Sequence, residues 1–255
     1  MTTELINEKK DGVMTLTINR PERRNAMNPA VIDGLIAAFD EADANPDIRC
    51  IVLTGAGDKA FCSGADLQTG KSFVFDFSSP TISFANLLRR TRACCVPIIA
   101  RVNGACMAGG MGLLAMADMA VASPHASFGL PEVKVGVFPM QVLSVLQHLI
   151  PERMLNEMCL TGDPISAAQA LELGLINHIA DPLDQKVDAL VSGILRNSPT
   201  AIRRGLYTIK RIKNMSFEES MSFTESQIGL LSMTEDAREG LQAFLDKRKP
   251  VWTGR

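Results

Sequence analysis

The stretch Asn103-Gly-Ala-Cys-Met-Ala-Gly-Gly-Met-Gly112 joins two segments of different character. The run before it, Val96–Val102 (VPIIARV), is typical of a buried strand, and the run after it, Leu113–Asp118 (LLAMAD), predicts a short helix. Glycines let a ligand approach bare backbone, and a helix starting beside Gly109 would present unpaired N–H groups and a partial positive charge. We therefore expect this turn to bind an oxygen that becomes negative during a reaction. A tight packing turn of small residues is the alternative.

The amino-acid composition limits the classes of protein to which the chain can belong. Its 255 residues are enough for one large domain or a domain with an appended subdomain. With 46% hydrophobic but only 5% aromatic residues, the core has to be aliphatic. The formal net charge of -2 argues against nucleic-acid binding driven by bulk charge. The longest weakly polar run, Val102–Ala117, falls short of the roughly 20 residues that cross a membrane. We expect neither a nucleic-acid nor a membrane partner.

Cysteines, histidines and the N-terminus add further exclusions. The six cysteines contain no CxxC spacing, so neither a disulfide framework nor a zinc site is predicted. The three histidines lack a metal-ligand spacing, and GxSxG and GxxxxGK[ST] motifs are missing. Met1–Glu4 has neither the basic nor the apolar region of a signal peptide. These features predict a cytoplasmic protein without a metal site.

The order of strand and helix patterns predicts an α/β fold. Val13–Asn19 alternates as a strand does, Asn28 is placed to cap a helix with Pro29 at its first position, and Ile48–Thr54 is a second apolar strand. This order favours a βαβ-type arrangement with a buried sheet. The last third of the chain has helical patterns. Gly55–Ala60 matches GxGxxA, but no helical pattern follows, so we do not expect a dinucleotide site there.

Two further segments contain candidate functional groups. Gly64-Ala-Asp-Leu67 is a second small-residue turn, in which Asp66 is suited to capping the segment that follows. Glu132 lies in the apolar run Phe128–Val135 (FGLPEVKV), where desolvation would raise the pKa of its carboxyl group toward the range useful for proton transfer. An ion pair with Lys134, or plain exposure, is the alternative for this side chain.

Taken together, these segments resemble the crotonase superfamily, the enoyl-CoA hydratase/isomerase family. The resemblance runs nearly end to end, and it is found in five segments that follow the family's order: Leu16–Ala26, Ala60–Leu67, Val102–Gly112, Phe128–Pro139 and Ala243–Pro250. It implies a crotonase (ClpP-like) spiral of ββα units, followed by C-terminal helices that build a trimer, often paired into a hexamer. We accordingly assign the spiral core with its acyl-CoA site to residues 1–195 and the helical oligomerisation region to residues 196–255.

The resemblance also implies the ligand and the residues that hold it. In the family, two backbone N–H groups bind the oxygen of a coenzyme A thioester, and by motif position these belong to Ala65 and Gly109. An enolate oxygen needs such fixed donors. No separate cofactor is implied, because coenzyme A is part of the substrate. The other residues expected to bind the substrate or its coenzyme A group are Arg23, Arg24, Ser63, Asp66, Leu67, Gln68 and Lys247. The residues expected to line the acyl tunnel are Phe73, Phe75 and Phe77.

One position distinguishes this sequence from the family's hydratases. Hydratases place two glutamates around the substrate; the second matches Glu132, but the first falls on Gly112, which has no side chain. A single base suffices to move a proton between two carbons, so the resemblance favours a Δ3,Δ2-enoyl-CoA isomerase with Glu132 as base and acid. The alternatives are an enoyl-CoA hydratase with the first glutamate replaced and a non-catalytic acyl-CoA-binding protein.

RNA binding, known for one branch of the family, is a further alternative. It would use the basic residues of one helical segment, which are Arg203, Arg204, Lys210, Arg211 and Lys213. This segment has the pattern of an ordinary solvated helix face, and the net charge gives RNA binding no support.

Overall fold

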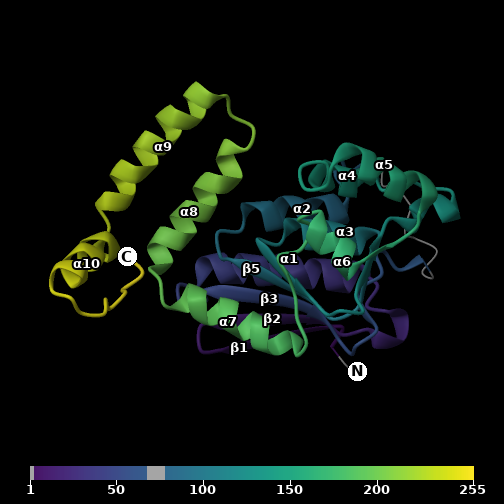
Figure 1. Ribbon diagram of the computed structural model, residues 1–255, viewed down its shortest axis with the longest axis horizontal. Coiled ribbons are helices and arrows are strands. Elements are labelled where there is room, and N and C mark those ends of the chain that lie inside the picture. The colour runs from purple at the N-terminus through teal and green to yellow at the C-terminus, as the bar shows by residue number, and fades with distance from the viewer. Residues whose placement is uncertain (1–2, 68–77) are drawn as a thin grey trace.

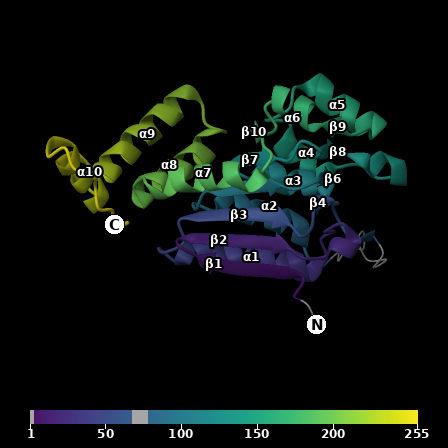
Figure 2. The same ribbon diagram turned by 60° about the horizontal axis from the view of Figure 1, so that its bottom comes forward.

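Two sheets of short, mostly parallel strands form the body of the protein (Figures 1 and 2). The computed structural model describes residues 3–67 and 78–255. The larger sheet has the order β1-β2-β3-β5-β7-β10, with strands β1 (Leu5–Lys10), β2 (Val13–Ile18), β3 (Cys50–Gly55), β5 (Ile98–Val102), β7 (Met119–Ala122) and β10 (His178–Ile179). The smaller sheet has the order β4-β6-β8-β9, with strands β4 (Ala60–Cys62), β6 (Ala105–Met107), β8 (Ser127–Gly129) and β9 (Ile165–Ser166).

Helices cover both faces of the larger sheet and form the whole C-terminal part. Those of the body are α1 (Pro29–Ala44), α2 (Ser83–Ala93), α3 (Gly109–Met116), α4 (Met140–Leu146), α5 (Glu152–Thr161), α6 (Ala167–Glu172) and α7 (Leu183–Leu195), with the 3-10 turns η1 (Pro21–Arg23) and η3 (Pro131–Val135). The C-terminal helices are α8 (Pro199–Ile212), α9 (Phe217–Ser232) and α10 (Glu235–Leu245). Figure 1 shows these three helices projecting from one side of the body.

The central strand β3 is buried on both faces of the larger sheet. Ile51 and Leu53 join the main apolar core, to which α1 also contributes, whereas Cys50 and Val52 pack with side chains of α7 on the opposite face. Successive side chains of a strand point to opposite faces, so a strand covered on both sides reads as a continuous apolar run. The predicted α/β fold with a buried sheet is therefore confirmed.

The predicted helix start at Asn28 is also confirmed. Its side-chain oxygen accepts a hydrogen bond from the N–H of Val31 at 3.0 Å, and Pro29 is the first residue of α1. A side-chain cap satisfies one of the N–H groups that a helix leaves unpaired at its start. The helix then buries one apolar stripe, which includes Leu35 and Phe39, against the sheet.

The smaller sheet positions the segments that the sequence singled out. Strands β4, β6 and β8 are parallel neighbours, so their carboxyl ends lie along one edge. The turn 63–67 follows β4, the start of α3 follows β6, and Glu132 follows β8.

Among the described helices, none combines the length and the apolar character that a membrane-crossing segment needs.

Candidate active site

The two small-residue turns lie directly against each other. A Cβ atom added to Gly64 would be 2.7 Å from Cβ of Ala108 and 3.0 Å from the backbone nitrogen of Gly109, and Gly64 has a φ of +97°. A Cβ atom on Gly110 would lie 2.3 Å from the carbonyl oxygen of Cys62, at the end of β4. Neither position has room for a side chain, so glycine is what allows the turn after β4 and the start of α3 to approach each other this closely.

The backbone pairing around Ala65 leaves its N–H group unused within the described chain. The N–H of Met27 donates to the carbonyl of Gly64 at 2.7 Å, and the N–H of Asp66 donates to the carbonyl of Met27 at 2.9 Å. In this parallel bridge the residue between the two bonds, Ala65, directs its own N–H elsewhere. Gly109 is the first residue of α3, where a helix has no acceptor for its N–H groups. Both expected donors are therefore backbone groups without an acceptor among the described residues.

A buried ion pair supports the turn that contains Ala65. One guanidinium nitrogen of Arg20 lies 2.7 Å from the carboxylate of Asp66, and another donates to the carbonyl of Ala26 at 2.6 Å. Both charged side chains are buried. The side chain of Asp66 is thus held by Arg20. Sequence reasoning did not single out Arg20, whose only signal was an arginine directly after a buried strand.

A cavity of about 310 Å³ opens beside Ala65. It is lined by Glu22, Arg23, Arg24, Ala26, Ser63, Ala65, Asp66 and Leu67. Six of the residues expected to bind substrate or coenzyme A are therefore neighbours around one hollow.

Two of the other three expected binding residues, Gly109 and Lys247, do not line this hollow. Gly109 is in the adjoining turn, and Gln68 lies outside the described residues, as do Phe73, Phe75 and Phe77 of the expected acyl tunnel. Lys247 follows α10, which Figure 2 shows at the opposite end of the molecule from β4. A single chain therefore does not bring Lys247 to this cavity.

Glu132 is half-buried in η3, with no ion pair to Lys134. Its Oε2 atom is buried and has no hydrogen-bond partner among the described residues. Lys134 pairs with Asp163 at 2.8 Å instead, so the alternative reading of a Glu132–Lys134 pair was wrong. Desolvation raises the pKa of the Glu132 carboxyl group. The charge of Glu132 adds to burial in raising the pKa of the Cys159 thiol.

Apolar side chains surround Gly112. A Cβ atom on this residue would lie 3.1 Å from Cζ of Phe84, 3.4 Å from Cδ2 of Leu88 and 3.5 Å from Cγ2 of Val142. Cζ of Phe84 also lies 3.4 Å from a Cβ atom added to Gly109, so the same ring borders Gly109 and Gly112 of α3. The described residues contain no cluster of side chains suited to hold a metal ion. The segments after β4, β6 and β8 therefore offer a candidate site two backbone donors, an apolar wall and one desolvated carboxyl group.

Comparisons with known proteins show the family of this chain. The sequence profile of the enoyl-CoA hydratase/isomerase family matches residues 8–255. Enoyl-CoA hydratase EchA19 of Mycobacterium tuberculosis is 35% identical over 258 residues, covering 97% of this chain and 96% of the relative. The crystal structure of an enoyl-CoA hydratase/isomerase from Mycobacterium paratuberculosis has a TM-score of 0.88 at 31% identity, covering 99% of each chain. That of the enoyl-CoA hydratase from Bacillus anthracis has a TM-score of 0.91 at 27% identity, covering 99% of this chain and all of the other. With the crotonase fold, the paired turns and matches over nearly its whole length, this chain is an enzyme of the enoyl-CoA hydratase/isomerase family.

Proposed function

We propose that this enzyme is an enoyl-CoA isomerase that moves a double bond from the Δ3 to the Δ2 position of an acyl-CoA thioester without a separate cofactor. The carboxylate of Glu132 takes a proton from C2 of the substrate, and the electron pair moves onto the thioester oxygen, giving a dienolate. The same carboxyl group, now protonated, returns the proton to C4. One proton leaves and one arrives, so the reaction needs no water and no other reactant.

The N–H groups of Ala65 and Gly109 would hold the thioester oxygen while it carries the negative charge. Donors fixed by backbone need no reorganisation when the charge appears, and the loss of one such donor typically costs about 3 kcal/mol of transition-state stabilisation. The tight contact between the two turns, with 3.0 Å from the added Cβ of Gly64 to the nitrogen of Gly109, supports this role because it keeps the donors at one spacing.

The observation that supports isomerisation most directly is the apolar surrounding of Gly112. A hydratase of the family would have a carboxylate at this position to hold water. Here Phe84, Leu88 and Val142 are all within 3.5 Å of where its Cβ would start. An apolar wall offers water no hydrogen-bond partner, and bringing a water molecule there would cost free energy. Glu132 alone is sufficient for a proton transfer between carbons.

Hydration remains the second candidate, because the relatives described above include proteins named enoyl-CoA hydratase. The two reactions are separated by supplying purified enzyme with 3-enoyl-CoA and 2-enoyl-CoA of several chain lengths. We expect double-bond migration with the first substrate and slow hydration of the second. Hydration of 2-enoyl-CoA as fast as migration would refute the isomerase proposal.

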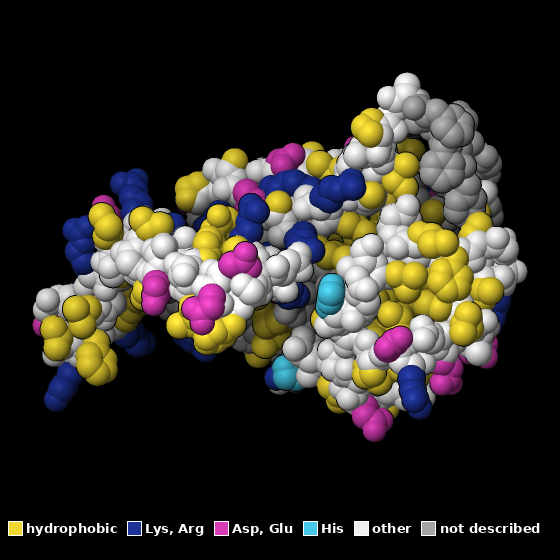
Figure 3. All heavy atoms as spheres, turned by 90° about the horizontal axis from the view of Figure 1, so that it is seen from above, with side chains coloured by type: hydrophobic (Ala, Val, Ile, Leu, Met, Phe, Trp, Pro, Cys, Tyr) yellow, Lys and Arg dark blue, Asp and Glu magenta, His cyan; other side chains and the backbone are white. Residues whose placement is uncertain are grey.

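We also propose that the active form is a homotrimer or a pair of trimers. The C-terminal helices expose large apolar side chains, including Phe217 at 73%, Met233 at 69% and Phe244 at 79% of their accessible surface. Figure 3 shows hydrophobic side chains along this projecting part. Surfaces of this kind are typical of contacts between subunits. Light scattering after size exclusion should give three or six times the mass of one chain, and a monomer at micromolar concentration would contradict the proposal.

A further inference from the structure

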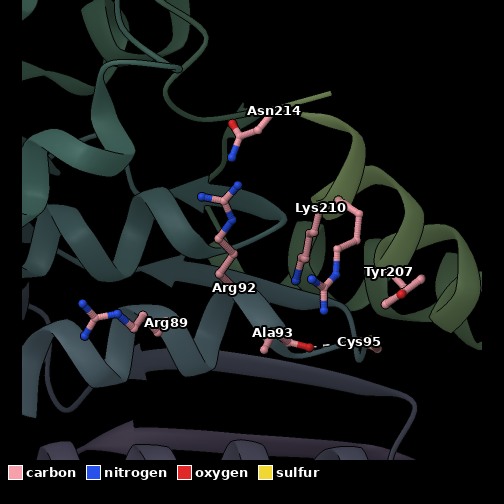
Figure 4. A pocket seen from close by; sticks show the side chains of 8 residues that line it. Arg89, Arg92, Ala93, Cys95, Tyr207, Lys210 and Asn214 are labelled. Atoms are coloured by element: carbon pink, nitrogen blue, oxygen red, sulfur yellow. Dashed lines mark hydrogen bonds between the residues drawn. The ribbon is translucent and has the colours of Figure 1, made fainter. Parts of the chain in front are cut away.

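A second cavity, of about 360 Å³, lies between α2 and α8. The residues that line it are Arg89, Arg92, Ala93, Cys95, Tyr207, Lys210, Arg211 and Asn214. Figure 4 shows basic side chains entering it from both helices, and Figure 3 shows Lys and Arg side chains gathered where the C-terminal helices leave the body. None of these residues lines the cavity beside Ala65.

Some of the basic groups near this cleft have acidic partners. The ammonium group of Lys210 lies 3.2 Å from the carboxylate of Asp118 and donates to the carbonyl of Cys94 at 2.7 Å. Arg90, on the neighbouring face of α2, pairs with both Asp40 and Asp43. The charges of Lys210 and Arg90 are therefore already balanced, and these residues hold the structure together.

Three arginines of the cleft are not balanced in this way. Arg89, Arg92 and Arg211 are exposed and have no ion pair with a described residue. Arg89 donates only to the neutral amide of Asn86, and Arg211 lies over the ring of Tyr207 at 5.3 Å. The C-terminal ends of α2 and α8 together supply roughly one negative charge as helix dipoles. About two positive charges therefore remain in excess within a chain whose formal net charge is -2.

The walls of the cleft are held in place. Lys210 links α8 to the end of α2 through Cys94. Arg203, two turns earlier in α8, donates to four backbone carbonyls around the end of α1, those of Ala42, Asp43, Asn45 and Ile48. A site whose walls are fixed before binding loses less conformational entropy when a ligand enters.

We propose that this cleft binds the diphosphate group of a nucleotide-sized molecule. A guanidinium group donates two parallel hydrogen bonds to phosphate oxygens, so arginines from two facing helices suit a ligand with more than one phosphate. The cavity volume lies within the range of small-molecule sites. The source is either a free nucleoside diphosphate or the nucleotide end of coenzyme A. This inference does not depend on which reaction the enzyme catalyses.

Calorimetric titration of the full-length enzyme with ADP tests the proposal. We expect saturable binding that weakens at least tenfold in Arg92→Ala/Arg211→Ala. The matched control is Arg153→Ala, which removes an exposed arginine of α5 that lines neither cavity. The control should bind ADP as the unmodified enzyme does. Absence of saturable binding, or an equal loss in the control, would overturn the proposal, because the second result indicates attraction by bulk charge.

A parallel titration with coenzyme A distinguishes the two sources. If Arg92→Ala/Arg211→Ala weakens ADP binding but leaves coenzyme A binding unchanged, the ligand is a free nucleotide. If the same variant weakens both and Arg23→Ala/Arg24→Ala weakens neither, the cleft takes the nucleotide end of coenzyme A. If only Arg23→Ala/Arg24→Ala weakens ADP binding, the diphosphate site is beside Ala65 and the proposal is overturned. Enzymatic turnover is measured in none of these titrations, so failure here leaves the isomerase proposal untouched.

Discussion

Replacing Glu132 by glutamine separates a catalytic role for this residue from a structural one. Glutamine has nearly the same size and cannot accept a proton from carbon. Because general base catalysis contributes about 10²–10⁴ in rate, the isomerisation rate should fall by that factor. The assay follows the ultraviolet absorbance of the conjugated 2-enoyl thioester formed from 3-enoyl-CoA. Glu157→Gln, on the exposed surface of the neighbouring helix α5, is the matched control and should keep full activity.

The same substitution should not destabilise the protein at neutral pH. Burial raises the pKa of Glu132 in the folded state above its unfolded value, so the folded state holds the proton more tightly. The stability gained from the protonated group is complete below the unfolded pKa and is lost as the pH rises through the folded pKa. Each unit of raised pKa corresponds to about 1.4 kcal/mol. At pH 7.5, Glu132→Gln removes a poorly solvated charge, and its melting temperature should equal or exceed that of the unmodified enzyme.

The two measurements together make the reasoning refutable. Any advantage of Glu132→Gln in melting temperature should disappear as the pH is lowered below about 4, where the glutamate is protonated in both states. In the unmodified enzyme, the acid limb of kcat/KM should lie at a higher pH than an exposed glutamate would give. Activity within threefold of the unmodified enzyme, or a large drop in melting temperature at pH 7.5, would mean that Glu132 is not the base or that its carboxylate has an essential partner.

Three further substitutions test the surroundings of the site. In Phe84→Ala/Gly112→Glu, removal of the ring makes room for a second carboxylate, and hydration of 2-enoyl-CoA should rise about tenfold or more over Phe84→Ala alone. Equal hydration in the two variants would show that the missing carboxylate at residue 112 is not what limits hydration. Arg20→Met leaves the buried Asp66 without its guanidinium partner and should lower the free energy of unfolding by about 3–5 kcal/mol in a urea titration. A loss below about 1 kcal/mol would show that the ion pair is dispensable for stability. Gly110→Ala places a methyl group 2.3 Å from the carbonyl oxygen of Cys62 and should push the two turns apart. Both the melting temperature and the isomerisation rate should fall. Unchanged values for both would show that the turns can shift without consequence.

The sequence was sufficient to predict the parts of the fold that follow from local pattern. The cap at Asn28 and the apolar run of β3 correspond to rules of spacing that tertiary contacts do not overturn. The short strands β4 and β6 were not predicted, because three residues are too few to show a period of two. The second sheet therefore became visible only through hydrogen bonds between segments far apart in the chain.

The candidate site shows a similar division. Small residues indicated both turns before their contact was known, and the apolar run around Glu132 indicated desolvation. The ion pair of Arg20 with Asp66 joins residues 46 positions apart, and no pattern in the sequence predicts which acid an arginine will meet. The ring of Phe84 reaches Gly112 from another helix, so the reason why that position is apolar could be found only in three dimensions.

The smaller sheet also sets the distances between the segments that carry the candidate catalytic groups. Neighbouring strands lie about 4.8 Å apart. The pairing of β4, β6 and β8 therefore sets the spacing of the three segments that follow them: the turn after β4, the start of α3 and the turn with Glu132. This spacing depends on backbone hydrogen bonds between the strands, whereas the base and the apolar wall are side chains that can be substituted one at a time. A change of reaction within such a framework requires new side chains beside the donors, while the distance between the donors stays constant.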